Sequence, residues 1–313
     1  MSNPLVSIVI PVYNKELWIS ESLRSVLNQS YQNWECIIIN DGSTDESLNK
    51  INSFIENHPA KWRVITIENS GQTFARNYGV KHSEGEYISF LDADDLWHPN
   101  KLEEQIEMFR STPDLEFVLT PYVIFTENQL SGFRIIKFKN PQQLVSGWLS
   151  MRGFGGLVES TGMVKKTTLV DLGFFSPALS MSSGLDLSLR LIKTRKSMVT
   201  PSPVVFYRLS DGQFHKNLDA LVSDLEIVRL THSFTPDSLK KLTDCHNNYL
   251  YWAEVRTLGR FHFLKRVLAT FLFFDIPKLT TLYFLVSRNL LALLRGLHWQ
   301  SEIRTFIQTH EAS

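Results

Sequence analysis

The sequence has few cysteines, no excess of charge of either sign and no long apolar run. Two of its 313 residues are cysteines, Cys36 in an apolar strand pattern and Cys245 in a helical one, so neither a disulfide framework nor a metal-binding pair is indicated. We therefore expect a reducing, cytoplasmic location. Lys plus Arg and Asp plus Glu number 32 each, so the overall charge gives no reason to expect nucleic acid as a partner.

Three further features are missing. The nine histidines include no His-x-x-x-His pair, so a zinc site of that kind is not predicted. The start, Met1 to Pro4, holds no basic residue, which argues against a cleaved signal peptide. Leu279 to Ser287, the longest uncharged run of the C-terminal part, is shorter than the roughly 18 apolar residues of a membrane-spanning helix.

Apolar runs alternate with helix-like segments in the first third of the chain. The predicted strands are Val6–Val12, Trp34–Asn40, Trp62–Ile67 and Tyr87–Leu91, and the predicted helices are Lys15–Gln29, one from about Glu46, Thr73–His82 and Asn100–Arg110. This alternation predicts a doubly wound, mostly parallel sheet whose right-handed crossovers bring the strand ends to one edge. Further strands are predicted at Phe117–Thr120, Arg134–Phe138, Thr161–Val164 and Val204–Arg208.

An acidic stretch follows the fourth predicted strand. Asp92, Ala93, Asp94 and Asp95 place three carboxylates at the carboxyl edge of the sheet, where ligands of such folds bind. No glycine-rich loop follows the first strand to hold phosphates, so phosphates here would need a metal ion. Asp92 and Asp94 suit a divalent cation, and the small Ala93 leaves room for the ligand. The alternative is a solvated loop in which Asp95 helps to start the next helix; a calcium loop is disfavoured because Trp97 stands where it needs a glycine.

Two other aspartates stand at the starts of turns or helices. Asp41 follows the second strand and can accept hydrogen bonds from a base or a ribose, although a turn of this composition also exists without a ligand. Asp186 stands at the start of a predicted helix. The favourable interaction of a carboxylate with the helix dipole would by itself explain an aspartate at this position. Gly153, Gly155 and Gly156 either line an acceptor cleft or form a surface loop.

Four blocks of sequence stand out by their order and spacing. They are Val6 to Asn14 (VSIVIPVYN), Trp34 to Ser47 (WECIIINDGSTDES), Asn69 to Gly79 (NSGQTFARNYG) and Glu84 to Lys101 (EGEYISFLDADDLWHPNK). Together they resemble the inverting glycosyltransferases of family 2, which have the GT-A fold. The likeness runs to about residue 210 and is strongest up to Arg110. It implies a GT-A catalytic domain at residues 1–215, with a Rossmann-like, mostly parallel sheet. After His215 the periodicity of the sequence itself turns helical, which predicts an all-helical region at residues 216–313.

The resemblance also implies a pocket for a nucleotide-sugar donor. Pro11, Tyr13, Asp41 and Arg76 would line the pocket of the donor nucleotide, with Asp41 reading the base. The donor is expected to be a UDP-sugar. The acceptor would be a hydroxyl group of a lipid-linked or cell-surface glycan.

The acidic stretch and Asp186 receive roles from the same resemblance. Asp92 would face the ribose and the metal, and Asp94 would bind the Mg²⁺ or Mn²⁺ that bridges the diphosphate, with Ala93 between them. Asp186 would be the catalytic base, although Leu185 replaces the glutamate that usually precedes it, and His215 is the first alternative base. Competing interpretations are a nucleotidyltransferase, which the missing glycine-rich loop disfavours, and a catalytically silent nucleotide-sugar-binding protein.

The C-terminal part is rich in Leu, Phe and Trp and carries an excess of positive charge. From Arg256 onward its charged residues are Arg256, Arg260, Lys265, Arg266, Lys278, Arg288, Arg295 and Arg304 against Asp275, Glu302 and Glu311. Basic side chains beside apolar ones suit a helix that lies on an anionic membrane surface. We therefore expect peripheral contact with the inner face of the plasma membrane. The alternative is that these apolar faces pack on the catalytic domain or on a second copy in a homo-oligomer.

Overall fold

The computed structural model describes residues 3–58, 61–125, 134–143, 159–180 and 182–208, together with residues 223–224, 227–228 and 230–232. All of them belong to one compact unit. The predicted boundary between residues 215 and 216 lies outside the described residues, as do His215 and the glycines 153, 155 and 156. The domain boundary, the cleft glycines and most of the all-helical region therefore stay predictions.

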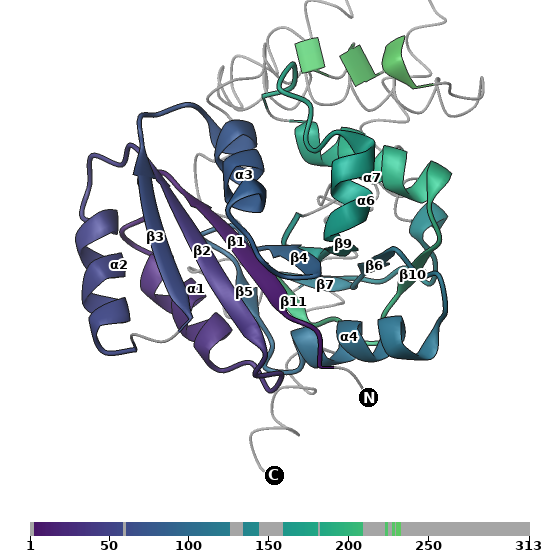
Figure 1. Ribbon diagram of the computed structural model, residues 1–313, viewed down its shortest axis with the longest axis horizontal. Coiled ribbons are helices and arrows are strands. Elements are labelled where there is room, and N and C mark those ends of the chain that lie inside the picture. Colours follow the sequence, from purple (N-terminus) through teal and green to yellow (C-terminus); the bar gives the residue numbers. More distant parts are fainter. Residues whose placement is uncertain are drawn as a thin grey trace, which may run out of the picture. The chain divides into compact units, whose positions relative to one another are not determined.

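Seven strands form the main sheet, in the order β10-β6-β9-β4-β1-β2-β3 (Figure 1). They are β1 Val6–Val12, β2 Trp34–Asp41, β3 Trp62–Ile67, β4 Tyr87–Phe90, β6 Phe117–Leu119, β9 Met163–Lys165 and β10 Ser197–Val199. Strand β1 is parallel to β2 and β4, and β2 is parallel to β3. Strand β9 is antiparallel to both of its neighbours, β4 and β6. The sheet is thus mostly parallel, as predicted, with one reversed strand.

Helices lie on both sides of this sheet. They are α1 Ile19–Leu27, α2 Ser47–Glu56, α3 Gln72–Lys81, α4 Lys101–Ser111, α6 Lys166–Leu172 and α7 Ser183–Thr194, with a 3₁₀ turn η1 at Glu159–Thr161. Figure 1 shows α3, α6 and α7 on one side and α1 and α4 on the other. The predicted first helix begins late because the Trp18 amide bonds the Lys15 carbonyl at 3.0 Å, a tighter turn than an α-helix makes. Within the described residues, no helix is long and apolar enough to cross a membrane.

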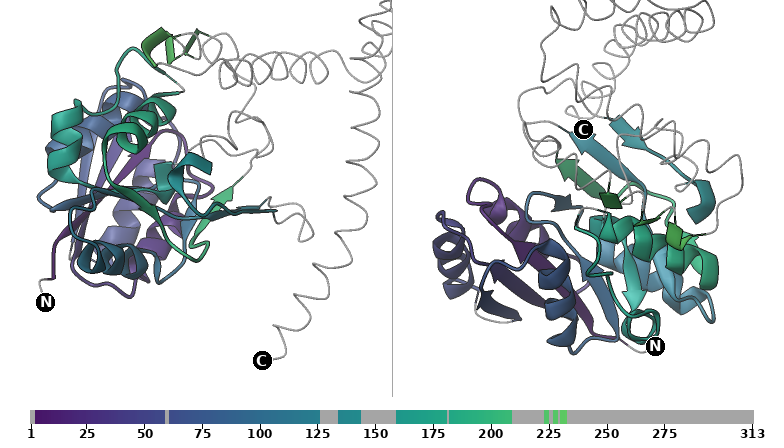
Figure 2. Two further views of the ribbon diagram at one scale, coloured as in Figure 1. Left: turned by 90° about the vertical axis from the view of Figure 1, so that its right-hand side faces the viewer. Right: turned by 90° about the horizontal axis from the view of Figure 1, so that it is seen from above.

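A second, four-stranded sheet has the order β5-β11-β7-β8. Its strands are β5 Leu96–Trp97, β7 Tyr122–Phe125, β8 Arg134–Ile136 and β11 Val205–Arg208, and Figure 2 shows it from two further directions. Strand β11 pairs antiparallel with β5 and parallel with β7. The sequence pattern did not predict β5, β7 or β10, because these strands are too short to show a period of their own. The pairing of β5 with β11 brings a distant part of the chain next to the acidic stretch.

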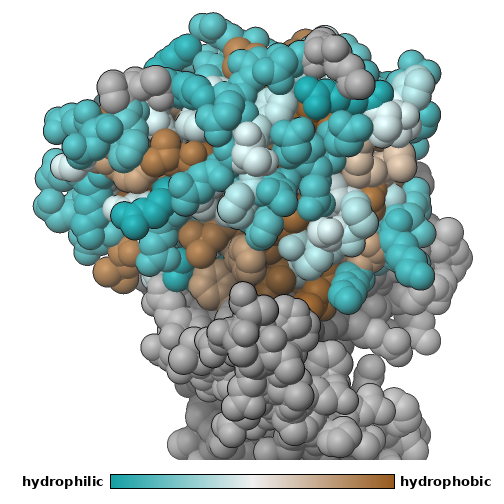
Figure 3. Space-filling model, turned by 90° about the horizontal axis from the view of Figure 1, so that it is seen from below, coloured by the Kyte–Doolittle hydropathy of each residue, from teal (hydrophilic) through white to brown (hydrophobic). Residues whose placement is uncertain are grey.

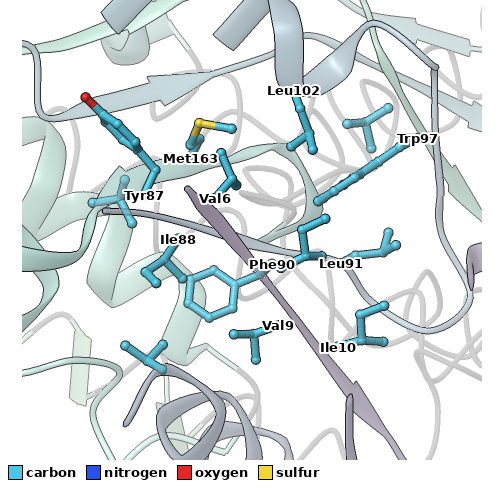
Figure 4. Close-up of a cluster of buried hydrophobic side chains, with 14 of the residues drawn as sticks. Val6, Val9, Ile10, Tyr87, Ile88, Phe90, Leu91, Trp97, Leu102 and Met163 are labelled. Atoms are coloured by element: carbon cyan, nitrogen blue, oxygen red, sulfur yellow. The ribbon is translucent and has the colours of Figure 1, made fainter. Parts of the chain in front are cut away.

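The hydrophobic core lies directly beneath the acidic stretch. Val9 on β1, Phe90 and Leu91 at the end of β4, and Trp97 on β5 are all buried and pack together with Leu102 of α4 (Figure 4). Burying each such side chain contributes about 1.5–3 kcal/mol. The end of β4, which Asp92 follows, is therefore fixed by the packing of these buried side chains.

The outer surface of the helices is polar. Figure 3 shows the molecule from the side of α1 and α4, where most of the described surface is hydrophilic and apolar side chains gather toward one edge. This is the distribution expected of amphipathic helices that cover a sheet. The described helices thus use their apolar faces for the core.

Candidate active site

The acidic stretch forms a tight turn between β4 and β5. The Asp95 amide bonds the Asp92 carbonyl at 2.9 Å, and the Ser22 hydroxyl of α1 lies 2.9 Å and 2.8 Å from the carbonyl oxygens of Ala93 and Asp95. Ala93 is 1% exposed, so its small side chain fits inside the turn. The Trp97 indole N–H donates to the Ser160 carbonyl at 2.9 Å. These bonds fix the backbone from which the three carboxylates project.

Asp95 is an internal anchor of the turn. Its carboxylate is completely buried and accepts hydrogen bonds from the Ser160 hydroxyl at 2.6 Å and from the Arg208 amide at 3.1 Å. Burial, with the charges of Asp94 and Asp92, raises the pKa of Asp95 well above its usual value. The alternative of a solvated loop with Asp95 at the start of the next helix is wrong, because Asp95 is buried and α4 begins at Lys101.

Asp92 is bonded to the first turn and a half of α3. Its Oδ1 accepts one hydrogen bond from Arg76 Nη2 at 2.7 Å and one from the side-chain Nε2 of Gln72 at 3.2 Å. The Arg76 guanidinium is 2% exposed and also pairs with Glu159 at 3.3 Å. Burial lowers the pKa of Arg76, but Asp92 and Glu159 outweigh burial and raise it. Arg76, predicted to line the nucleotide pocket, thus reaches the candidate site through Asp92.

Asp94 projects from the same turn toward a lysine. It is 4% exposed, and its Oδ2 lies 2.5 Å from the Lys15 ammonium. Burial raises the pKa of Asp94, the Lys15 charge opposes this and the Asp92 charge adds to it. Asp94, the carboxylate predicted to bind the metal, is thus already paired with the positively charged side chain of Lys15.

Asp41 binds the loop in front of α3. Its Oδ1 accepts from the Ser70 amide at 2.7 Å and its Oδ2 from the Gly71 amide at 3.0 Å. Gly71 has φ +87°, which favours glycine, and α3 begins at the next residue. Because Gln72 and Arg76 of this helix bond Asp92, the N-terminus of α3 connects Asp41 with Asp92. Both aspartates thus bond to the same end of one helix.

The end of β1 supplies the other predicted pocket residues. Pro11 is buried within β1, and Tyr13, directly after it, is 48% exposed. The Asn14 side chain accepts from the Thr44 amide at 2.8 Å, so the loops after β1 and β2 are joined. Tyr13 therefore presents an exposed ring beside the strand end that carries Asp41.

Asp186 lies in the first turn of α7, and each of its two carboxylate oxygens has a hydrogen-bond partner. Its Oδ2 accepts from Arg190 Nε at 3.0 Å and Nη2 at 2.7 Å, and its Oδ1 is 2.8 Å from His232 Nε2. Burial raises the pKa of Asp186, but the hydrogen bonds from His232 and Arg190 outweigh it and hold the pKa below its usual value. Asp186 is thus an ionised carboxylate at neutral pH.

The first turn of α7 lies against the parts that hold Asp92. The hydroxyls of Thr73 on α3 and Ser183 on α7 are 2.9 Å apart. A Cβ at Gly184 would come within 1.9 Å of Glu159 Oε1, so Glu159 fits only against a glycine there. The ends of β1, β2 and β4, the start of α3 and the start of α7 form one candidate site.

Comparison with known proteins agrees with this arrangement. Residues 7–156 match the family model described as glycosyl transferase family 2. This part of the chain belongs to glycosyltransferase family 2. The chain spans about half the length of the first curated relatives that it matches, between 42% and 64% of each.

Individual relatives of this family 2 domain include one named enzyme. The chain is 34% identical over 178 residues to the UDP-Glc:alpha-D-GlcNAc-diphosphoundecaprenol beta-1,3-glucosyltransferase WfgD of Escherichia coli, which covers 56% of this chain and 64% of that protein. A curated glycosyltransferase of Haemophilus influenzae is 42% identical over 126 residues, 40% of this chain and 47% of its own length.

A solved structure shows the same fold. The mannosyltransferase PcManGT from Pyrobaculum calidifontis, in complex with GDP-Man and Mn²⁺, has a TM-score of 0.60 at 18% identity, and the match covers 96% of this chain and 84% of that one. At such identity the likeness shows the fold alone. The predicted GT-A class is confirmed.

The family 2 domain offers oxygen ligands for a divalent cation at Asp92 and Asp94. Among the described residues no group of three or more His, Cys, Asp or Glu forms a metal cluster, so substrate oxygens would have to complete the coordination. The network around the turn contains five carboxylates and three cations, namely Glu21, Asp92, Asp94, Asp95 and Glu159 with Lys15, Arg76 and Arg208. Carboxylate oxygens are the ligands that Mg²⁺ and Mn²⁺ prefer, so Asp92 and Asp94 fit either ion.

Several residues of the candidate site were not predicted from the sequence. Lys15 stands next to the VYN block and could have been noticed as a cation beside a predicted phosphate site. Glu159, Ser160, Arg208 and His232 are far from the motifs in sequence and carry no local pattern. The pairing of β9 with β4 brings Glu159 and Ser160 to the site, the pairing of β11 with β5 brings Arg208, and the contact with α7 brings His232.

Proposed function

We propose that this chain is an inverting glycosyltransferase that transfers a sugar from a nucleoside-diphosphate sugar to a hydroxyl group. The observation that carries the proposal is the start of α3, which bonds Asp41 through Gly71 and Asp92 through Arg76 while it also contacts the first turn of α7. In this proposal, the groups that would bind the nucleotide, hold the phosphates and act as the base lie around one sheet edge. Such an edge is where α/β folds bind their ligands.

The proposed donor is a UDP-sugar. WfgD, the relative at 34% identity, is named for UDP-Glc and for an acceptor linked to diphosphoundecaprenol. In our proposal the exposed ring of Tyr13 stacks on the base, Pro11 borders it, and Asp41 reads it while holding the loop before α3. The acceptor is proposed to be a lipid-linked glycan.

Asp92 and Asp94, on either side of Ala93, would hold Mg²⁺ or Mn²⁺, which when bound neutralises charge on the departing diphosphate as a Lewis acid. Lys15, which pairs with Asp94, would move from Asp94 to a phosphate oxygen when the cation binds. Arg76 keeps Asp92 in a fixed orientation. Because Asp92 accepts from Arg76 and Gln72 through Oδ1, its Oδ2 would be the oxygen that holds the cation.

Asp186 is the proposed catalytic base. Its lowered pKa keeps it ionised, and it would take the proton of the acceptor hydroxyl as that oxygen attacks the anomeric carbon. The bond from the anomeric carbon to the diphosphate oxygen breaks, and the diphosphate leaves with the bonding electrons. One displacement from the opposite face inverts the configuration.

A screen of nucleotide sugars tests the donor proposal. The full chain is heated with UDP-, GDP- and other nucleotide sugars, each with Mn²⁺, Mg²⁺ or EDTA. Specific binding to the folded state raises the melting temperature with ligand concentration, and we expect the largest metal-dependent rise with a UDP-sugar. Binding without release of UDP in a turnover assay would favour the catalytically silent alternative, and release of pyrophosphate would favour a nucleotidyltransferase.

A further inference from the structure

A segment beyond the second sheet contacts the first turn of α7. The Asp224 carboxylate accepts from the Ser182 amide at 2.8 Å, and His232 Nε2 lies 2.8 Å from Asp186 Oδ1. Val228, midway between them, is completely buried, and its carbonyl accepts from the His232 amide at 3.0 Å. Residues four apart lie on one face of a helix. Asp224, Val228 and His232 therefore form one face, which is turned toward α7.

The contacts of Asp186 divide its two oxygens between two partners. Arg190 donates two hydrogen bonds to Oδ2, and His232 Nε2 is hydrogen-bonded to Oδ1. An ionised carboxylate only accepts hydrogen bonds, so the hydrogen is assigned to Nε2 of the imidazole. Each carboxylate oxygen has two lone pairs, so these bonds leave a limited set of directions from which an acceptor hydroxyl can approach. His232 is one of the two groups that set this direction.

His232 is placed to act through Asp186 and not on substrate itself. Its Nε2 is already engaged with the Asp186 carboxylate. It also lies well past residue 156, where the match to the family model ends. The side chain thus belongs to a part of this chain that the family pattern does not describe.

We propose that His232 is a positioning residue that aims the Asp186 carboxylate at the acceptor hydroxyl through the Nε2–H···Oδ1 hydrogen bond. The inference rests on the proposed function, because it takes Asp186 as the base. Loss of the bond lets the carboxylate rotate about the side held by Arg190. A misplacement of about 1 Å in such a group can cost about 10²-fold in rate.

Three variants of the full chain separate this role from a structural one. His232→Ala removes the bond, and His232→Gln keeps an N–H donor at nearly the position of Nε2. Asp224→Ala is the matched control, since it removes the other contact between the same segment and α7 without touching Asp186. The assay measures UDP release from the UDP-sugar that stabilises the chain most, with a lipid-linked monosaccharide as acceptor, alongside donor affinity by calorimetry.

We expect His232→Ala to lower kcat about 10-fold to 100-fold with donor affinity and KM unchanged, and His232→Gln to stay within a few-fold of the unaltered chain. Asp224→Ala should lower the melting temperature without that loss of kcat. If His232→Ala folds and turns over like the unaltered chain, or if Asp224→Ala loses kcat equally, the inference is overturned while the proposed function stands. Absence of UDP release by the unaltered chain, despite donor binding, would overturn both.

Discussion

In the proposed site, Lys15 and a divalent cation would compete for one carboxylate, that of Asp94. The Lys15 ammonium lies 2.5 Å from Asp94 Oδ2, where a bound cation would also have to lie. Lys15→Met should therefore raise the affinity for Mn²⁺ in the absence of nucleotide, because a positive charge that occupies Asp94 is removed. We expect at least a several-fold lower dissociation constant, measured by Mn²⁺ electron paramagnetic resonance.

The matched control for this change is Lys50→Met. Lys50 donates to the Glu16 carbonyl at 2.9 Å, so Lys50→Met removes the same charge from the loop that follows Lys15. Equal Mn²⁺ affinity of Lys15→Met and Lys50→Met would show that Lys15 does not compete for the site.

Asp186, the proposed base, gives the fold a specific pH dependence of stability. Its folded-state pKa is lowered, so the ionised form adds stability above the unfolded-state pKa of about 3.9, and this is lost as the pH falls through the folded-state value. Asp186→Asn should therefore unfold more easily than the unaltered chain at pH 7, by roughly 1–3 kcal/mol, with the difference shrinking below about pH 4. Urea unfolding at several pH values measures this.

The same variant should retain donor binding and lose about 10²-fold to 10⁴-fold in turnover, since an amide cannot accept the proton. Asp171→Asn, an exposed carboxylate on the neighbouring helix α6, is the control and should change neither quantity appreciably. Turnover of Asp186→Asn close to that of the unaltered chain would mean that another residue is the base.

At the scale of elements, α3 is placed by its fit on β1. A Cβ at Gly79 would lie 2.3 Å from Val9 Cγ1, so the helix can approach the strand only with glycine there. Gly79→Ala should lower the free energy of unfolding by about 1–3 kcal/mol through overpacking. Urea unfolding gives this value, and Lys81→Ala, at an exposed position of the same helix, is expected to stay within about 0.5 kcal/mol. A Gly79→Ala variant as stable as the unaltered chain would contradict the close packing of α3.

The long alternating elements could be predicted from sequence and the short ones could not. Strand β1 matches its predicted ends, because a continuous apolar run identifies a buried parallel strand. Strand β3, a partly buried strand at the edge of the sheet, matches its predicted ends too. Strand β9 was predicted nearly in place, but its antiparallel pairing depends on contacts between distant segments. Arg208 of β11 and His232, which bond Asp95 and Asp186, are distant from them in sequence, so no local pattern could reveal these two partners.

At the scale of the whole molecule, the C-terminal part stays a prediction. The eight basic residues from Arg256 onward against three acidic ones predict attraction to an anionic membrane surface, about 1 kcal/mol for each basic side chain near it. In a flotation assay with anionic vesicles, we expect the full chain to float with the vesicles and a chain that ends near Thr257 to stay in the unbound fraction. Equal flotation of the two chains, or flotation that raised salt does not reduce, would remove the basis for an electrostatic anchor.

Calorimetry of UDP binding with Mn²⁺ tests the account most directly, because it tests whether the turn after β4 is the metal and diphosphate site. The account predicts metal-dependent binding of UDP to the full chain. It predicts loss of that binding in Asp94→Ala, since neither Asp92, held by Arg76, nor the buried Asp95 can supply a carboxylate at that place. Metal-dependent affinity in a folded Asp94→Ala chain equal to that of the unaltered one would contradict the account.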